Sequence, residues 1–390
     1  MSHLMNTYAR QPIAFTKGKG AWLWDENDRP YLDALSGIAV NGVGHAHPKL
    51  VKAISEQAQQ LIHTSNIYHV LKQEELADKL CAVAQMDKAF FCSSGAEANE
   101  AAIKLARLYG HQKGIEQPTI IVMEKAWHGR TIATLSATGS RKAQAGFEPL
   151  VSGFVRVPFN DLEAIQVVAQ NNRNIVAVLL EPIQGEGGIR VAETSYMQAL
   201  SQLCKQNDWL FMIDEVQTGI GRTGHWFAFE EMGVKPDVLA LAKGLGSGVP
   251  IGACLASGKA ADVFKPGNHG TTFGGGPLVC AAAIATLEIM AEERLAENAA
   301  TLGHYMKERL THELMHTKGV VEVRGKGLML GIELDRPCGE LVAQAITQGL
   351  LINVTSDKVV RLLPPLIINK EEATQIVDGV VSLIKAFLNG

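Results

Sequence analysis

The chain has 390 residues, of which 47% are apolar and 19% are charged. This composition is typical of folded globular proteins, and it excludes intrinsic disorder, collagen and coiled coils. The length predicts two to three structural units, or one large domain with an attachment. Acidic residues outnumber basic residues by 40 to 36, so no positive surplus is present to bind a nucleic-acid backbone.

Targeting and redox features favour the cytoplasm. Residues 1–12 contain no apolar core of a signal peptide, and the apolar run at 278–287 is interrupted by Glu288 before it could cross a bilayer. The six cysteines form no CxxC pair and are sparse, which is typical of a reducing compartment.

The elements predicted along the chain indicate an α/β fold. A hairpin over 18–33 and a helix over 48–61 come first. Short apolar runs then alternate with helical stretches. The predicted strands are 89–92, 119–123, 154–157, 175–180, 210–213, 238–241 and 252–256, and the predicted helices are 96–108, 162–170, 195–206 and 278–290. Continuously apolar strands between helices predict a mostly parallel sheet that helices cover on both faces.

The pattern changes after about residue 300 to helix, two strands, helix, strand and helix, which predicts a smaller α+β lobe. We therefore expect three parts. Residues 1–60 form an N-terminal segment that joins the small lobe, residues 61–295 form the large domain, and residues 296–390 form the C-terminal small domain.

Polar residues that follow the predicted strands are the candidates for chemistry, because ligands bind beyond the carboxyl ends of parallel strands. Small residues at 93–99 open a helix and offer free backbone N–H groups to an anion. Asp214 ends one apolar strand, and a buried carboxylate needs a cationic partner. Lys243 ends another, where burial would lower the pKa of its amine and favour a Schiff base.

Together these three features match what pyridoxal phosphate needs. Its phosphate needs a helix N-terminus, its pyridine nitrogen needs a carboxylate, and its aldehyde needs a lysine. Each feature also has an ordinary structural explanation: helix capping, a surface loop or a lysine that reaches solvent. Their combination in one chain favours the cofactor.

The sequence resembles the class III (subgroup II) aminotransferases of pyridoxal-phosphate fold type I over essentially its whole length. The most specific stretch is 212–224, MIDEVQTGIGRTG, followed by Lys243-Gly244. Within that class it is most similar to the acetylornithine aminotransferases. Further matching segments are GIAVN at 37–41, GHAHP at 44–48, WHGRT at 127–131, EPIQGEGG at 181–188 and GTTFGG at 270–275.

The resemblance implies a role for each matching residue of the cofactor site. Lys243 would bind pyridoxal phosphate and move the proton, and Asp214 would pair with the pyridinium nitrogen. The other cofactor contacts would be Gln217 to the ring 3-oxygen, Gly95 and Ala96 to the phosphate, Trp127 stacked on the ring where the family usually has Phe or Tyr, and Thr272 to the phosphate of the neighbouring subunit.

The resemblance also implies the substrate contacts. Arg130 would bind the α-carboxylate and Thr271 would touch the substrate. Arg361 would bind the second carboxylate of 2-oxoglutarate, and Glu186 would cover Arg361 while the donor is bound. The implied reaction moves the distal amine of N2-acetylornithine to 2-oxoglutarate in arginine biosynthesis, in a homodimer with shared active sites.

Several alternatives stay open at this point. Another ω-amino donor, such as succinylornithine, succinyl-diaminopimelate, ornithine or 4-aminobutyrate, fits the same motifs. A pyridoxal-phosphate decarboxylase or aminomutase would share Lys243 and Asp214. The pair His45 and His47 lacks further ligands at metal spacing, so we expect no metal site. No P-loop or GxSxG motif is present.

Overall fold

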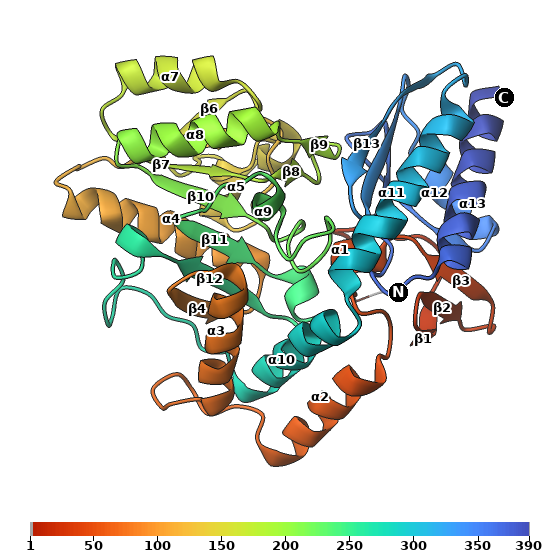
Figure 1. Ribbon diagram of the computed structural model, residues 1–390, viewed down its shortest axis with the longest axis horizontal. Coiled ribbons are helices and arrows are strands. Elements are labelled where there is room, and N and C mark those ends of the chain that lie inside the picture. The colour runs from red at the N-terminus through yellow and green to blue at the C-terminus, as the bar shows by residue number, and fades with distance from the viewer. Residues whose placement is uncertain (1–2, 390) are drawn as a thin grey trace.

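The computed structural model describes residues 3–389. A larger lobe holds an extended sheet between helices, and a smaller lobe combines the C-terminal elements with the first strands of the chain (Figure 1). Within the described residues, no helix is both long and apolar enough to span a lipid bilayer.

The largest sheet within residues 3–389 has seven strands. In spatial order they are β4 (Lys88–Cys92), β12 (Gly252–Ala256), β11 (Val238–Leu241), β10 (Leu210–Asp214), β7 (Ile175–Leu180), β5 (Thr119–Met123) and β6 (Phe154–Val157). The pairs from β11 to β6 are parallel, whereas β12 runs antiparallel to both of its neighbours. The expected mostly parallel mixed sheet is thus confirmed.

Successive residues of the central strands pack into two different cores, because side chains alternate between the faces of a strand. Ile120 and Val122 of β5 join one core, and Ile121 and Met123 join the other. Helix α4 (Gly95–Gln112) covers the first face and helix α8 (Thr194–Gln206) packs against β10 on the second. Burial on both faces explains why these strands are apolar throughout.

Two smaller sheets of four strands each belong to the second lobe in the described part of the chain. The first consists of β1 (Phe15–Lys19), β2 (Trp22–Asp25), β3 (Pro30–Asp33) and β15 (Leu350–Leu351); the second consists of β13 (Val320–Lys326), β14 (Met329–Leu334), β17 (Val359–Leu362) and β16 (Asn353–Thr355). The parallel pairing of β3 with β15 joins the start of the chain to its C-terminal part. A two-stranded ribbon, β8 (Ile183–Gln184) and β9 (Arg190–Val191), follows β7.

The remaining helices complete both lobes. They are α1 (Ser36–Ala39), α2 (Pro48–Gln60), α3 (Leu71–Ala84), α5 (Ile132–Ala137), α6 (Arg141–Gln144), α7 (Leu162–Asn171), α9 (Ala228–Glu231), α10 (Pro277–Glu292), α11 (Leu295–Leu314), α12 (Leu341–Thr347) and α13 (Lys370–Asn389), with 3₁₀ turns at Lys243–Leu245 and Gly258–Ala260. Helix α10 packs against α2 and α3 and is apolar around most of its surface, which explains its long apolar run.

The structure corrects three details of the prediction. The N-terminal hairpin is a three-stranded unit that begins at Phe15, and the single strand expected near the C-terminus is three short strands. Helix α3 was not predicted, although Leu76, Leu80 and Ala84 recur every four residues and are buried. The domain boundaries at residues 60 and 295 stay a prediction.

Candidate active site

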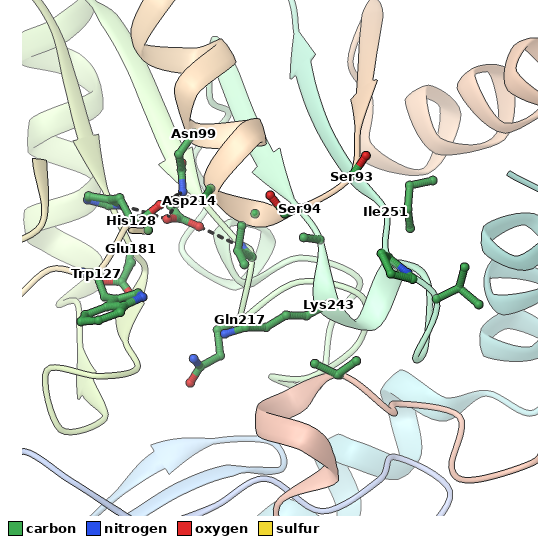
Figure 2. A pocket seen from close by; sticks show the side chains of 18 of the residues that line it. Ser93, Ser94, Asn99, Trp127, His128, Glu181, Asp214, Gln217, Lys243 and Ile251 are labelled. Carbon is green, nitrogen blue, oxygen red and sulfur yellow. Dashed lines mark hydrogen bonds and ion pairs between the residues drawn. The ribbon is translucent and has the colours of Figure 1, made fainter. Parts of the chain in front are cut away.

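The ends of four strands of the large sheet surround a cavity of about 350 Å³ (Figure 2). This volume is within the range of small-molecule sites. The cavity is lined by Val40, Ser93, Ser94, Gly95, Ala96, Asn99, Trp127, His128, Gly129, Glu181, Asp214, Val216, Gln217, Ala242, Lys243, Gly248, Val249, Pro250 and Ile251. Six residues predicted from the sequence, Gly95, Ala96, Trp127, Asp214, Gln217 and Lys243, therefore lie together at its wall.

Lys243 follows β11 and begins a 3₁₀ turn with a positive φ of 43°. A non-glycine residue in this region is strained, and such strain gathers at functional sites. Burial lowers the pKa of the Lys243 amine from 10.5 to about 8, and the positive charge of Arg361 is the second cause of this shift. The amine therefore loses its proton more readily than an ordinary lysine does, as nucleophilic chemistry requires.

Asp214 is buried at the end of β10, where two side chains donate to the same carboxylate oxygen (Figure 2). Asn99 Nδ2 and His128 Nδ1 each lie 2.7 Å from Asp214 Oδ2. The backbone N–H of Val216 donates to the other oxygen at 2.9 Å. These contacts fix the position of the carboxylate at the cavity wall.

Glu181 is a second buried carboxyl group in the cavity. It follows β7 and accepts hydrogen bonds from the backbone N–H groups of Trp127 at 2.9 Å and Gly185 at 3.2 Å. Burial raises the pKa of Glu181 to about 7, and the His128 side chain acts in the opposite direction. The cavity thus contains two carboxyl groups, Asp214 and Glu181, in different environments.

The N-terminus of helix α4 opens onto the same cavity. Ser94 caps the helix, and its side chain accepts from the Glu97 N–H, while its carbonyl accepts from the Ala98 N–H. The first four N–H groups of a helix have no intrahelical acceptor. Two of them, at Gly95 and Ala96, belong to residues that line the cavity. They provide a site that favours a phosphate group.

A half-buried ion pair lies next to Gln217 at the side of the cavity. Arg361 NH1 is 2.7 Å from Glu186 Oε1 and 3.3 Å from Gln217 Oε1. The Arg361 side chain is 0% exposed and that of Glu186 is 33% exposed. Neither Glu186 nor Arg361 lines the cavity. Arg361 contacts Gln217, which does line it. The structure therefore brings together two residues that lie 175 positions apart in the sequence.

Arg130 lies at the edge of the site. Its guanidinium carbon is 4.6 Å from the centre of the Trp127 ring, in a cation–π arrangement. The Arg130 side chain is exposed, and the residue is not part of the cavity lining. Its predicted substrate contact therefore stays a prediction.

Thr271 and Thr272 do not line the cavity of this chain. They belong to an exposed loop whose Thr271 carbonyl accepts from Asn66 Nδ2 at 3.2 Å. Thr272 itself is exposed. The prediction that they complete the site of a neighbouring subunit is untested by a single chain.

Three residues of the site were quoted in the sequence motifs without a role: Asn99, His128 and Glu181. Glu181 directly follows the strand Ile175–Leu180, so the strand-end rule that selected Asp214 would also have selected it. His128 and Asn99 could be assigned only once the fold had placed them against Asp214. The two histidines of the motif at 44–48 each contact a carboxylate: His45 contacts Asp33, and His47 contacts Glu293.

This arrangement provides an amine of lowered pKa, a fixed carboxylate and a helix N-terminus around one cavity. Residues 4–384 match the family Aminotransferase class-III. An acetylornithine aminotransferase of Nitrosomonas europaea is 62% identical over 388 residues, which are 100% of this chain and 99% of that protein.

Solved structures agree with the family match. An ornithine aminotransferase of Toxoplasma gondii, with pyridoxal phosphate partly occupying its active site, has a TM-score of 0.95 and 33% identity, covering 98% of this chain and 92% of that one. An acetylornithine aminotransferase of Elizabethkingia anophelis has a TM-score of 0.88 and 37% identity, covering 99% of this chain and 97% of that one. The chain therefore belongs to the class-III aminotransferase family.

Proposed function

We propose that this chain is a pyridoxal-phosphate-dependent aminotransferase that moves the distal amino group of N2-acetylornithine to 2-oxoglutarate, a step of arginine biosynthesis. The observation that carries the proposal is the position of Lys243 and Asp214, which end neighbouring strands and line one cavity. The 62% identity to an acetylornithine aminotransferase supports the choice of donor.

The residues of the cavity fit this cofactor. The N–H groups of Gly95 and Ala96 would hold the phosphate, and Asp214 would keep the ring nitrogen protonated. The Trp127 ring would stack on the pyridine ring, and the Gln217 amide would donate to the ring 3-oxygen. When bound, pyridoxal phosphate supplies an aldehyde that accepts the donor amine and a ring that withdraws electrons.

Lys243 would hold the cofactor covalently and then carry the proton. With a pKa of about 8, roughly a tenth of its amine is neutral at pH 7, far more than for an ordinary lysine, and the neutral amine is the form that a general base requires. The amine would remove a proton from the substrate carbon that bears the distal amino group. It would return that proton to the cofactor carbon that bears the amino group after the transfer. Asn99 and His128, which each lie 2.7 Å from Asp214 Oδ2, would hold that carboxylate in place during the transfer.

Apolar residues in and directly after α1 support an acylated donor. Ile38 packs against an apolar cluster that contains Ile189 and Leu363, and Val40 lines the cavity. A donor whose α-amine is acylated carries no positive charge there and needs no anionic partner. The ornithine aminotransferase of high structural similarity makes ornithine the alternative donor.

Two arginines would allow one cavity to accept two differently charged substrates. Arg130 would bind the α-carboxylate in both half-reactions, as a planar guanidinium can do with two parallel bonds. Arg361 would bind the second carboxylate of 2-oxoglutarate once Glu186 moves away. The NH2 group of Arg361 is buried and has no hydrogen-bond partner among residues 3–389, so it has a donor available for this carboxylate.

We further propose that the chain acts as a homodimer in which Thr272 reaches the phosphate of the partner subunit and Thr271 reaches its substrate. Exposed apolar side chains lie in and beside their loop: Phe273 belongs to it, the backbone of Ile62 lies beside Gly276, and Ile67 follows Asn66, which donates to the Thr271 carbonyl. Apolar surface of this kind is typical of an interface between chains.

We assign the protein to the cytoplasm, because its six unpaired cysteines suit a reducing compartment.

A spectrum of the purified protein tests the proposal. We expect added pyridoxal phosphate to give a visible absorption band, which N2-acetylornithine then removes and 2-oxoglutarate restores. Loss of carbon dioxide from the donor, without glutamate formation, would indicate a decarboxylase instead. No band in the wild-type protein and its retention of activity without the cofactor would refute the proposal.

A further inference from the structure

The Arg361 guanidinium group fixes the orientation of the Gln217 side-chain amide. Arg361 NH1 lies 3.3 Å from Gln217 Oε1. A guanidinium group can only donate hydrogen bonds, so the amide atom that faces it must be the oxygen. The NH2 group of Gln217 consequently points elsewhere, and Gln217 lines the cavity. The amide therefore offers donors, rather than an acceptor, to a bound molecule.

The backbone of Gly185 closely approaches the same amide. A Cβ atom on Gly185 would lie 2.3 Å from Gln217 Oε1 and 2.5 Å from its Cδ. The backbone of Gly185 has no positive φ, so close approach to Gln217, and not an unusual dihedral angle, requires glycine here. The amide is thus confined between a backbone and a guanidinium group.

Arg361 is itself a fixed donor. Its Nε donates to Asn353 Oδ1 at 2.8 Å, and its NH1 also donates to Glu186 Oε1 at 2.7 Å. The side chain is fully buried, so little freedom remains to turn away from Gln217. A guanidinium group held in this way determines which atom of the amide it meets.

We propose that Arg361 is a positioning residue for Gln217, which it holds with the NH2 group facing the ring 3-oxygen of the cofactor. This inference rests on the proposed function and adds a second task for Arg361, separate from binding 2-oxoglutarate. The task is performed before any substrate arrives. It links the site of the second carboxylate to the cofactor ring through one side chain.

The link has a measurable consequence at Lys243. In the loaded protein, the Lys243 nitrogen would lie within reach of the ring 3-oxygen, and a hydrogen bond donated to that oxygen by Gln217 would lower the proton affinity of the Lys243 nitrogen. The charged groups that act on Lys243 are Arg361 from β17, Glu186 from the loop after β8, Asp214 from β10 and Glu181 from the end of β7. Removing Arg361 also removes a positive charge, so one variant alone cannot separate the two effects.

A double-mutant cycle separates them. The midpoint pH of the visible band is measured in the cofactor-loaded protein without substrate. We expect Gln217→Met to raise the midpoint by about 0.5–1 pH unit, the equivalent of one neutral hydrogen bond. Arg361→Met should raise it in the wild-type background, and by clearly less in the Gln217→Met background. Equal shifts in the two backgrounds would overturn the proposal, because they would leave only the effect of charge.

Two further variants keep the test decisive. Gly185→Ala displaces the amide without changing any charge, and we expect it also to raise the midpoint; an unchanged midpoint would count against the proposal even if Arg361→Met failed to load. Glu340→Gln, which removes an exposed acid of the smaller lobe, is the control and should leave the midpoint unchanged. Circular dichroism checks the fold of each variant. A wild-type protein without a visible band would refute the proposed function, whereas a band with equal shifts refutes this inference alone.

Discussion

Replacing Glu186 with glutamine should separate the two half-reactions. The change removes the charge that faces Arg361 at 2.7 Å and retains the shape of the side chain. Arg361 stays buried and charged, with Asn353 and Gln217 as its remaining partners. In the wild-type protein the second carboxylate of 2-oxoglutarate must compete with Glu186 for Arg361. In the variant it does not.

The magnitude follows from the exposure of the pair. Hydrogen bonds to charged groups contribute about 1.5–3 kcal/mol. Glu186 is 33% exposed, so water weakens its contact and the lower figure applies. About 1.5 kcal/mol corresponds to roughly a tenfold change in affinity. We therefore expect Glu186→Gln to bind 2-oxoglutarate about tenfold more tightly and to slow the N2-acetylornithine half-reaction.

Single-turnover kinetics provide the measurement, with each half-reaction followed separately by absorbance. Glu340→Gln, which removes an exposed acid of the smaller lobe, is the matched control and should leave both rates unchanged. Equal effects of Glu186→Gln on the two half-reactions would refute the role of Glu186 as a substrate-dependent cover.

Three further predictions follow from the site. Lys243→Ala should remove transamination and leave the fold intact; turnover above about a hundredth of wild type would contradict its role, since proton transfer contributes about 10²–10⁴-fold. Mixing Lys243→Ala with Thr272→Ala subunits should restore activity, because a hybrid dimer contains one complete site; no recovery after proven subunit exchange would contradict sharing. The rate of pyridoxal phosphate loading should rise with pH around a midpoint of about 8, because burial keeps the Lys243 amine neutral above that pH; a midpoint near 10.5, the ordinary lysine value, measured by growth of the visible band, would exclude the buried amine as the nucleophile.

The seven strands of the large sheet could be predicted because each contains a short run of mainly apolar residues. The signal is clearest in central strands such as Ile175–Leu180 and Val238–Leu241, where every residue is buried, and weaker at the two edges, where Lys88 and Arg156 are exposed. Residues such as Asp214 and Lys243 were recognisable because a polar group that ends such a strand is conspicuous. Strands such as Leu350–Leu351 were not, because two residues carry no periodic pattern and exist only through their pairing with β3.

Contacts between residues far apart in the chain were harder to predict from the sequence. The Glu186–Arg361 pair was expected from the family resemblance, and the structure places the two side chains in contact. Nothing in the local sequence relates Gln217 to Arg361 or His128 to Asp214, because the fold alone brings these elements together. The contacts of Arg130, Thr271 and Thr272 with substrate or cofactor stay predictions.

A panel of amino donors at a fixed concentration of 2-oxoglutarate, with glutamate as the measured product, tests the central claim most directly. The panel contains N2-acetylornithine, succinylornithine, succinyl-diaminopimelate, ornithine and 4-aminobutyrate. We expect N2-acetylornithine to give the highest kcat/KM, because Ile38 packs in an apolar cluster and Val40 lines the cavity, which suits a donor without a charged α-amine. A higher kcat/KM for ornithine or 4-aminobutyrate, or no glutamate from any donor, would contradict the account.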